Sequence, residues 1–386
     1  MQRSPLFLIF LLWCAGLGAA GQFAKIAVPF DLIGQRYPDS GAGLGLLLSM
    51  ISFAGIVLGM TAGILVARHG FRRLLVLGLI VGALCSAWQA TMPGFAQMLT
   101  SRIVEGLSHL VIVVAAPTLI AQIAGDRLRG PAMTLWSTFF AVAFSIVAWL
   151  GLPMAEAYGI QLLFLIHGGI MATLAALVWW LLDPDENSTR SGNALNLGEV
   201  LGLHLYAYRS ASVAAPAVGW LFYTLTFVSL VAILPGLLPE GQRAAVVGLM
   251  PVASIGVSLL IVTPLLRYWP AVRIVMAGFA LSAAVLGSYW LGVPPAATCI
   301  ALFAVLGLVQ GASFAAIPQL NASARDRALA NGAMAQMGNL GNTLGTPVLM
   351  IVLQSGGTAG MLAAVILFYA AGIVLHIWMQ RRRMLA

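Results

Sequence analysis

Residues 159–182 read GIQLLFLIHGGIMATLAALVWWLL and contain no Asp, Glu, Lys or Arg. As a helix rising 1.5 Å per residue, such a run is about 36 Å long, enough to cross a hydrocarbon layer of about 30 Å. The next six residues, DPDENS at 183–188, stop a helix and expose charge. A long apolar run with an abrupt polar end is typical of a membrane-spanning helix.

The same length criterion finds eleven further runs along the chain. The twelve predicted spans are residues 6–30, 43–66, 73–91, 95–124, 131–155, 159–182, 213–238, 244–266, 272–291, 296–320, 328–353 and 357–380. The composition is 61% apolar and 8% charged, too little charge for a water-soluble surface. Because lipid cannot hydrogen-bond to loose backbone amides, the sequence predicts an all-α membrane protein.

The basic residues orient these spans. With a cytoplasmic N-terminus, fifteen of the nineteen Lys and Arg residues fall at cytoplasmic ends, and only Arg36 and Arg243 fall outside. This positive-inside asymmetry also accounts for the net charge of +8 without a nucleic-acid partner. We expect a bacterial-type inner-membrane protein, surrounded by the lipid bilayer, with both termini cytoplasmic. The N-terminal run resembles a cleaved signal peptide, but it stays apolar to about Phe30 and is interpreted as the first span.

The chain divides into two similar halves. We predict an N-terminal six-helix bundle at 1–182, a cytoplasmic linker at 183–212 and a C-terminal six-helix bundle at 213–386. VEGLS at 104–108 is matched by VQGAS at 309–313, and other short matches follow in order at nearly the same offset. The order indicates two pseudo-symmetric bundles that rock around a central site, with shared membrane composition as the alternative explanation.

The loop after the second span carries a recognisable pattern, GILVARHGFRR at residues 63–73. In spacing and position it resembles the signature loop of the major facilitator superfamily, which implies a role in conformational change. The matching residues are Gly63, Arg68, Gly70, Arg72 and Arg73. Ala67 stands where the family usually has Asp, which puts in doubt the charge network that this Asp joins in the family.

The fourth span adds a second resemblance. Arg102, followed four residues later by Gly106, is similar to a fourth-span motif that the family associates with proton coupling. The fifth span lacks the Gly-Pro-rich pattern usual in drug/proton antiporters of the family. The resemblance therefore names the superfamily and not the substrate.

Three ionisable residues of the fourth span share one helix face. Glu105 follows Arg102 by three residues and precedes His109 by four. Because ionisable groups at membrane depth are costly, they indicate function. We expect Glu105 or His109 to load and unload a proton under the influence of Arg102, with a static ion pair that locks helices as the alternative. His167, in the sixth span, is interpreted as a hydrogen-bonded core histidine.

The remaining candidates are substrate-binding residues. Lys25, the only lysine, lies on the same face of the first span as Gln22, and with Arg102 and Glu105 it gives a net charge of +1. This sum favours a small organic anion, although Lys25 can instead extend to the outer headgroups. Polar residues of the tenth and eleventh spans complete the prediction, either as substrate ligands or as ties between helices. The predicted substrate-binding set is Gln22, Lys25, Arg102, Gln310, Gln336 and Asn339.

Taken together, these patterns predict a monomeric secondary transporter that moves a small solute, coupled to protons, by alternating access. A proton-driven multidrug efflux antiporter is the alternative, followed by an uncoupled facilitator or channel. No nucleophile, phosphate loop or paired carboxylates suggest an enzyme, and the three widely spaced cysteines suggest no metal site or other cofactor.

Overall fold

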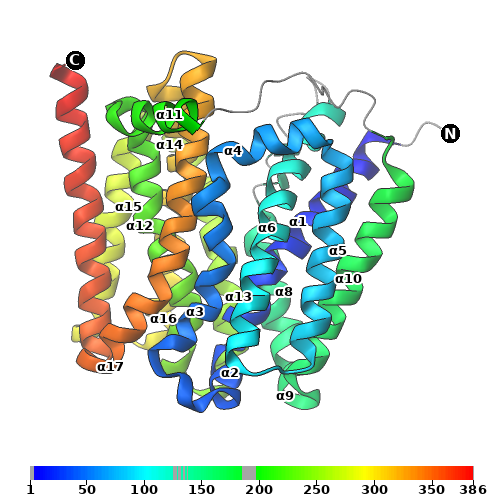
Figure 1. Cartoon of the computed structure of the whole chain (residues 1–386). Helices are drawn as coiled ribbons and strands as arrows, with labels where there is room; N and C mark the ends of the chain where they lie inside the picture. The colour runs from blue at the N-terminus through cyan, green and yellow to red at the C-terminus, as the bar shows by residue number, and fades with distance from the viewer. Residues whose placement is uncertain are drawn as a thin grey trace. The chain divides into compact units, whose positions relative to one another are not determined.

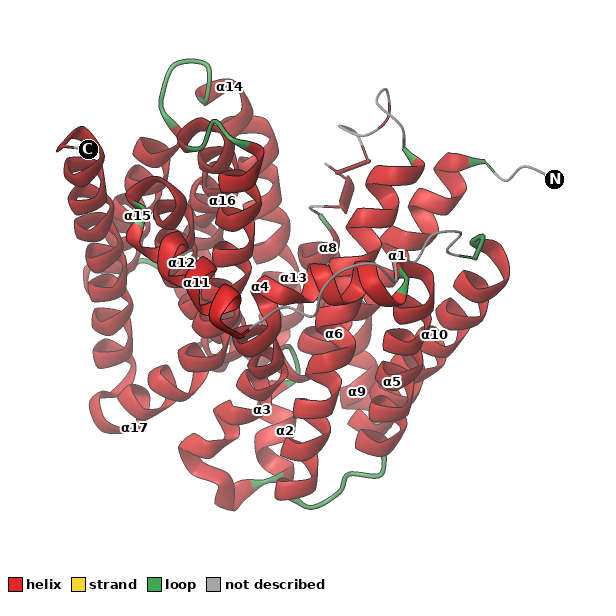
Figure 2. Cartoon of the chain, turned by 45° about the horizontal axis from the view of Figure 1, so that its top comes forward, coloured by secondary structure: helices red, strands yellow, loops and turns green. Residues whose placement is uncertain are grey.

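The computed structural model describes residues 4–124, 128, 132–133, 135–136, 138–184 and 197–385. Regular structure in these ranges is helical throughout, and no strand occurs among them (Figure 2). The contacts divide the chain into two compact units (Figure 1). Unit 1 is Met1–Ser40 with Thr61–Ala194, and unit 2 is Gly41–Met60 with Leu195–Ala386. The change of unit after Ala194 falls within the predicted linker, whereas Gly41–Met60 was predicted to belong to the first bundle.

Unit 1 contains five of the candidate spans. Its described elements are α1 (Pro5–Ala27), α2 (Phe30–Arg36), α5 (Phe71–Ala90), α6 (Phe95–Ile123), α8 (Phe139–Ile146), the π-helical η3 (Val147–Gly151), α9 (Leu152–Tyr158) and α10 (Ile160–Leu181). The last three short elements before α10 continue one another and make a single candidate span, Phe139–Tyr158. Helix α1 contacts α6, α8 and α10, while α5 lies between α6 and α10 in the contact pattern.

Unit 2 contains the second candidate span and those from the seventh onward. Its elements are η1 (Pro38–Gly45), α3 (Leu46–Ser49), η2 (Met50–Ser52), the start of α4 (Phe53–His69), α11 (Leu197–Arg209), α12 (Ala211–Ile233), η4 (Leu234–Leu237), α13 (Glu240–Val257), η5 (Ser258–Val262), α14 (Thr263–Leu265), α15 (Ala271–Gly287), η6 (Ser288–Leu291), α16 (Pro295–Leu320) and α17 (Ala324–Leu385). The short helix α11 lies across the ends of the longer helices of this unit (Figure 1).

The number of membrane crossings follows from a break in α17. Eleven described helical runs are long and apolar enough to span a membrane, and the last of them, Asp326–Leu385, has 60 residues. Inside it, Gly357 adopts φ 61° and ψ −169°. This non-helical residue marks a kink between two helices, and each part of the 60-residue run is long enough to be a span, so α17 supplies two spans. The predicted twelve-span, all-α fold is thereby confirmed.

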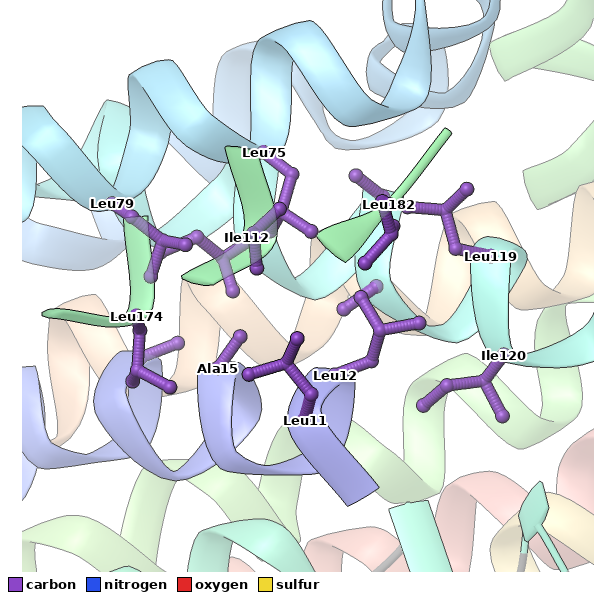
Figure 3. Packing of buried hydrophobic residues seen from close by; sticks show 14 of the residues in the cluster. Leu11, Leu12, Ala15, Leu75, Leu79, Ile112, Leu119, Ile120, Leu174 and Leu182 are labelled. Atoms are coloured by element: carbon purple, nitrogen blue, oxygen red, sulfur yellow. The ribbon is translucent and has the colours of Figure 1, made fainter. Parts of the chain in front are cut away.

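Aliphatic side chains from four helices form the core of unit 1. Leu12 of α1, Leu75 of α5, Ile112 of α6 and Leu174 of α10 point toward one another (Figure 3), and the first three are fully buried. Large apolar residues also face outward, such as Trp180 at 72% exposure. Lipid is the surrounding in which such an exposed apolar surface carries no cost.

Close approach of two helix backbones holds unit 2 together. A Cβ atom added at Gly341 of α17 would lie 2.6 Å from the carbonyl oxygen of Leu221 in α12. No side chain fits there, and one turn later Gly345 meets α12 in the same way. Small residues at such contacts let membrane helices pack by van der Waals attraction, because lipid provides no hydrophobic force between them.

Candidate functional site

One carboxylate binds two cations in the interior of unit 1. Lys25 of α1 places its Nζ atom 2.6 Å from Oε1 of Glu105 in α6. Arg102, one turn before Glu105, donates from Nη1 to the other carboxylate oxygen, Oε2. All three residues have 0% exposure. The spacing of three residues along α6 puts Arg102 and Glu105 on one face of the helix, where Glu105 also meets Lys25 of α1.

Helix α5 supplies the neutral partners of this cluster. Gln89 donates from Nε2 to Glu105 Oε2 at 2.8 Å, and Lys25 Nζ lies 2.5 Å from Ser86 Oγ. Both α5 residues are fully buried. Two cations and one carboxylate leave the cluster with a net charge of +1. A buried excess of charge is costly, so the excess within these three residues is the main electrostatic feature of the site.

Two buried amide oxygens border the cluster without a hydrogen-bond partner among the described atoms, Gln22 Oε1 and Gln89 Oε1. The neighbours fix which amide atom faces them. Ser108 donates its hydroxyl to the Gly78 carbonyl, so Gln22 must donate to Ser108 through Nε2, at 2.8 Å. Gln89 is oriented in the same way by a serine and by Glu105. Unsatisfied buried acceptors are rare, and a water molecule or a bound donor group is the usual explanation.

His167 of α10 extends the cluster through Ser86. Its Nδ1 atom lies 2.8 Å from Ser86 Oγ, and its Nε2 atom lies 2.9 Å from the carbonyl oxygen of Gly18. Both ring nitrogens thus have partners, as expected of a hydrogen-bonded core histidine. The ring nevertheless contacts the charged cluster, which its position in the sequence did not suggest.

His109 takes a different direction. Its Nδ1 atom lies 3.0 Å from the carbonyl oxygen of Ala19, and its ring packs edge-on against Phe23. The predicted Arg–Glu–His face therefore separates: Arg102 and Glu105 pair with each other, while His109 hydrogen-bonds to the backbone of α1.

The polar candidates of unit 2 bind different helices. Gln310 of α16 accepts through Oε1 from Tyr223 of α12 at 3.2 Å and from Ser254 of α13 at 3.0 Å. Asn339 of α17 donates to its own helix at Ala335. Within this unit, these residues and Gln336 do not gather in one cluster.

Gln336 of α17 is occupied by neighbours at both ends of its amide. Its Oε1 atom accepts from the hydroxyl of Tyr208 in α11 at 2.7 Å, and its Nε2 atom donates to the Ile56 carbonyl at 2.8 Å. His204 Nε2 lies 3.3 Å from the same amide nitrogen. Burial raises the pKa of Tyr208 to about 12, so this hydroxyl remains a donor at physiological pH. In this conformation Gln336 joins the linker helix α11 to the bundle.

Comparison with known proteins identifies the family. Residues 6–346, most of the chain, match the sequence profile of the Major Facilitator Superfamily. The chain belongs to the major facilitator superfamily. It is therefore a multi-pass membrane transporter of that superfamily, and its predicted membership is confirmed.

Solved structures and a curated protein give further likenesses within the superfamily. A bacterial homologue of the human lysosomal transporter Spinster, inward-facing and unoccupied, is 14% identical with a TM-score of 0.74, over 99% of this chain and 98% of that one. A D-xylose–proton symporter is 12% identical with a TM-score of 0.77, over 97% of both chains. The methylenomycin A resistance protein of Bacillus subtilis (strain 168) is 23% identical over 173 residues, which span 44% of this chain and 36% of that protein. At these identities the solved structures establish the fold alone.

The superfamily's signature loop is described in part. Gly70 adopts φ 93° at the start of α5, a conformation that favours glycine. Arg72 donates to the carbonyl of Trp179, and its guanidinium lies 4.5 Å over that indole ring. Arg73 occupies the first turn of α5. Gly63 and Arg68 lie in α4, but the surroundings of Gly63 and the side chain of Arg68 are outside the described part of the chain, as is Asp126. The role of the loop in this transporter stays a prediction.

Sequence reasoning about this superfamily member missed Ser86 and Gln89. Both are neutral residues near the C-terminal end of the apolar helix α5, so no charge marks them. Their spacing of three residues along α5, which puts two polar groups on one face, is the signal that was available. As for metals, the described residues contain no group of three or more His, Cys, Asp or Glu side chains that could hold an ion.

Proposed function

We propose that this transporter carries a small organic anion together with a proton, and that the cluster of Lys25, Arg102 and Glu105 couples the two. The observation that supports this proposal is the excess positive charge of the fully buried cluster. The excess is relieved in two ways: an anion binds, or a proton leaves. Binding of the anion therefore favours the protonated cluster, and this linkage makes anion and proton travel together.

A static helix lock is the alternative explanation of the cluster, and unit 2 provides an internal comparison. Gln310 occupies the position that matches Glu105 in the sequence repeat. It ties α16 to α12 through Tyr223, as Glu105 ties α6 to α1 through Lys25. Neutral groups suffice for this tie in the second repeat. Since buried charges are more costly than neutral hydrogen bonds, their retention in the first repeat supports a role beyond packing.

The closed state of the cluster sets a condition on the mechanism. With 0% exposure, Lys25 and Glu105 are out of reach of solute in this conformation. We infer that another conformation of the alternating-access cycle opens the cluster to one side of the membrane, while the two predicted bundles move as bodies. The unsatisfied oxygens of Gln22 and Gln89 suit a substrate hydroxyl, so a hydroxycarboxylate is the preferred class of anion.

The test is uptake by proteoliposomes with an inwardly directed proton gradient. We expect saturable accumulation of radiolabelled lactate, weaker accumulation of propionate, which lacks the hydroxyl, and counterflow exchange that distinguishes a carrier from a channel. Glu105→Gln should lose gradient-driven accumulation. Tyr223→Phe, which removes the matching tie in unit 2, is the control and should retain it. If Glu105→Gln accumulates lactate as the unmodified protein does, the cluster has no coupling role.

Export of an antibiotic is the second candidate function. It is favoured by the resistance protein among the relatives, which has 23% identity over part of the chain. Gradient-driven movement of tetraphenylphosphonium, without transport of lactate or propionate, would support a cation exporter and overturn the anion proposal.

The membrane location and the orientation are also part of the proposal. Most basic residues fall at the predicted cytoplasmic ends, which supports a bacterial-type inner membrane and cytoplasmic termini. A reporter active only in the cytoplasm, fused after Ala386, should be active, and a reporter active only outside should be silent.

A further inference from the structure

Ser86 bridges two titratable residues that belong to different helices. Its Oγ atom lies 2.5 Å from Lys25 Nζ of α1 and 2.8 Å from His167 Nδ1 of α10. The serine itself, on α5, is fully buried, as is Lys25. His167 retains 7% exposure and is the least enclosed of the three. The three residues thus connect the charged cluster to a titratable side chain on a third helix.

The chemistry of the partners fixes the direction of each hydrogen bond. A lysine ammonium group only donates, so Ser86 accepts from Lys25 and is free to donate its own hydrogen to His167 Nδ1. The carbonyl oxygen of Gly18 only accepts, so His167 carries its hydrogen on Nε2. His167 is then the neutral tautomer with Nδ1 as acceptor. Both hydrogen bonds through Ser86 therefore donate in the direction from Lys25 to His167.

We propose that Lys25, Ser86 and His167 form a proton relay that loads and unloads the charged cluster. The inference rests on the proposed proton coupling and names the route of the proton. One N–H bond of Lys25 breaks and Ser86 Oγ gains that hydrogen, while the original hydroxyl hydrogen of Ser86 moves to His167 Nδ1. Lys25 becomes a neutral amine, Ser86 is again a hydroxyl, and His167 becomes an imidazolium. One positive charge leaves the cluster, and no other bond changes.

The groups around Lys25 agree with this direction. After the transfer, Arg102 and Glu105 remain as a neutral pair, held by Gln89. The other titratable groups nearby are Cys85 of α5 and His109 of α6, while α10 adds the ring of Phe164, 5.5 Å from Lys25 Nζ. Helix α8, which also packs against α1, contains no titratable residue. His167 is therefore the residue that is hydrogen-bonded to Lys25 through a single hydroxyl.

Two variants interrupt the relay without changing the charge of the cluster. His167→Gln keeps a hydrogen-bonding side chain that does not titrate, and Ser86→Ala removes the bridging hydroxyl. In the proteoliposome assay with radiolabelled lactate, each should lower gradient-driven accumulation at least tenfold and retain counterflow exchange. Ser86→Thr, which keeps a hydroxyl, should restore accumulation. Ser49→Ala is the matched control, because Ser49 is an equally buried hydroxyl that donates to the Gly45 carbonyl and lies outside the cluster.

A spectroscopic measurement tests the relay independently of transport. The chain has five histidines, so nitrogen NMR of protein labelled at histidine, with His167→Gln for assignment, isolates the signal of His167. We expect hydrogen on Nε2 and a hydrogen-bonded Nδ1 whose shift changes in Ser86→Ala. Hydrogen on Nδ1, or full gradient-driven accumulation by His167→Gln, would overturn the relay and leave the proposed function intact. If the unmodified protein shows no gradient-driven accumulation, both proposals are wrong.

Discussion

Substitutions of Glu105 and Lys25 should affect stability very unequally, although the two residues form one ion pair. Glu105→Gln removes the carboxylate that lies between two cations. Lys25 and Arg102 then remain as two positive charges buried side by side. Lys25→Met removes the excess charge instead, and it leaves Arg102 paired with Glu105. Glu105→Gln therefore increases the net positive charge of the cluster, whereas Lys25→Met leaves the cluster neutral.

The magnitudes follow from burial and pairing. At the 2.6 Å separation of Lys25 and Glu105, the attraction of unit charges is about 6 kcal/mol at an effective dielectric constant of about 20. Desolvation offsets part of this, and removing one partner of a buried pair costs about 3–5 kcal/mol. We expect Glu105→Gln to lose that much. For Lys25→Met, the lost attraction is balanced by relief of the burial cost of Lys25 and of its repulsion with Arg102, so the change should stay within about 1 kcal/mol.

The assay is reversible unfolding in mixed micelles, followed by the fluorescence of the ten tryptophans. The free energy of unfolding is compared for the unmodified protein, Glu105→Gln and Lys25→Met. Equal losses in the two variants, or a larger loss in Lys25→Met, would refute the idea that the cluster carries one positive charge too many. Lys25 would then be an ordinary stabilising partner, and the electrostatic basis of anion binding would be lost.

Three further predictions concern packing and the linker helix. Gly341→Ala should lower the free energy of unfolding by about 1–3 kcal/mol, because the new Cβ atom would meet the α12 backbone. Gly256→Ala is the control in the same assay: a Cβ atom there has no atom within 4 Å, and the change should raise the free energy of unfolding by about 0.5–1 kcal/mol. Gly357→Ala should cost about 1–3 kcal/mol through backbone strain at φ 61°; an unchanged free energy of unfolding would show that the turn relaxes. Tyr208→Phe should unfold at a lower temperature than the unmodified protein below pH 10. The raised pKa of Tyr208 means that the folded state keeps its proton while the unfolded state loses it, so the difference should shrink between pH 10 and about 12; a difference that grows over this range would contradict the assignment.

The twelve spans were predictable from the sequence because lipid imposes one simple condition, a sufficiently long apolar run. The boundary between the last two spans, expected between 353 and 357, falls at Gly357. The association of Gly41–Met60 with unit 2 was not predictable, since it depends on contacts between helices distant in the sequence. The pattern of apolar residues within one span does not specify which other helices pack against it.

The candidate site shows the same limit at the level of single residues. Local spacing brought Arg102 and Glu105 together correctly, because a helix fixes the relation of positions three apart. It did not fix the partner of His109, which lies about 6 Å further along the axis of α6 and meets the backbone of α1 instead. Ser86 gains its importance only from the meeting of α1, α5 and α10.

The comparison of the two repeats gives the strongest reason to place function in unit 1. Both repeats need polar groups that tie the fourth helix of the half to the first. The second half does so with Tyr223 and Gln310, whose neutral hydrogen bond leaves no net charge behind. The first half uses Lys25 and Glu105 and buries an additional arginine beside them. Packing alone would favour the neutral solution in both halves, because it avoids the desolvation of three charges. A cluster that is one positive charge in excess is therefore best explained by a cycle in which an anion binds to it, or a proton leaves it, at each turn.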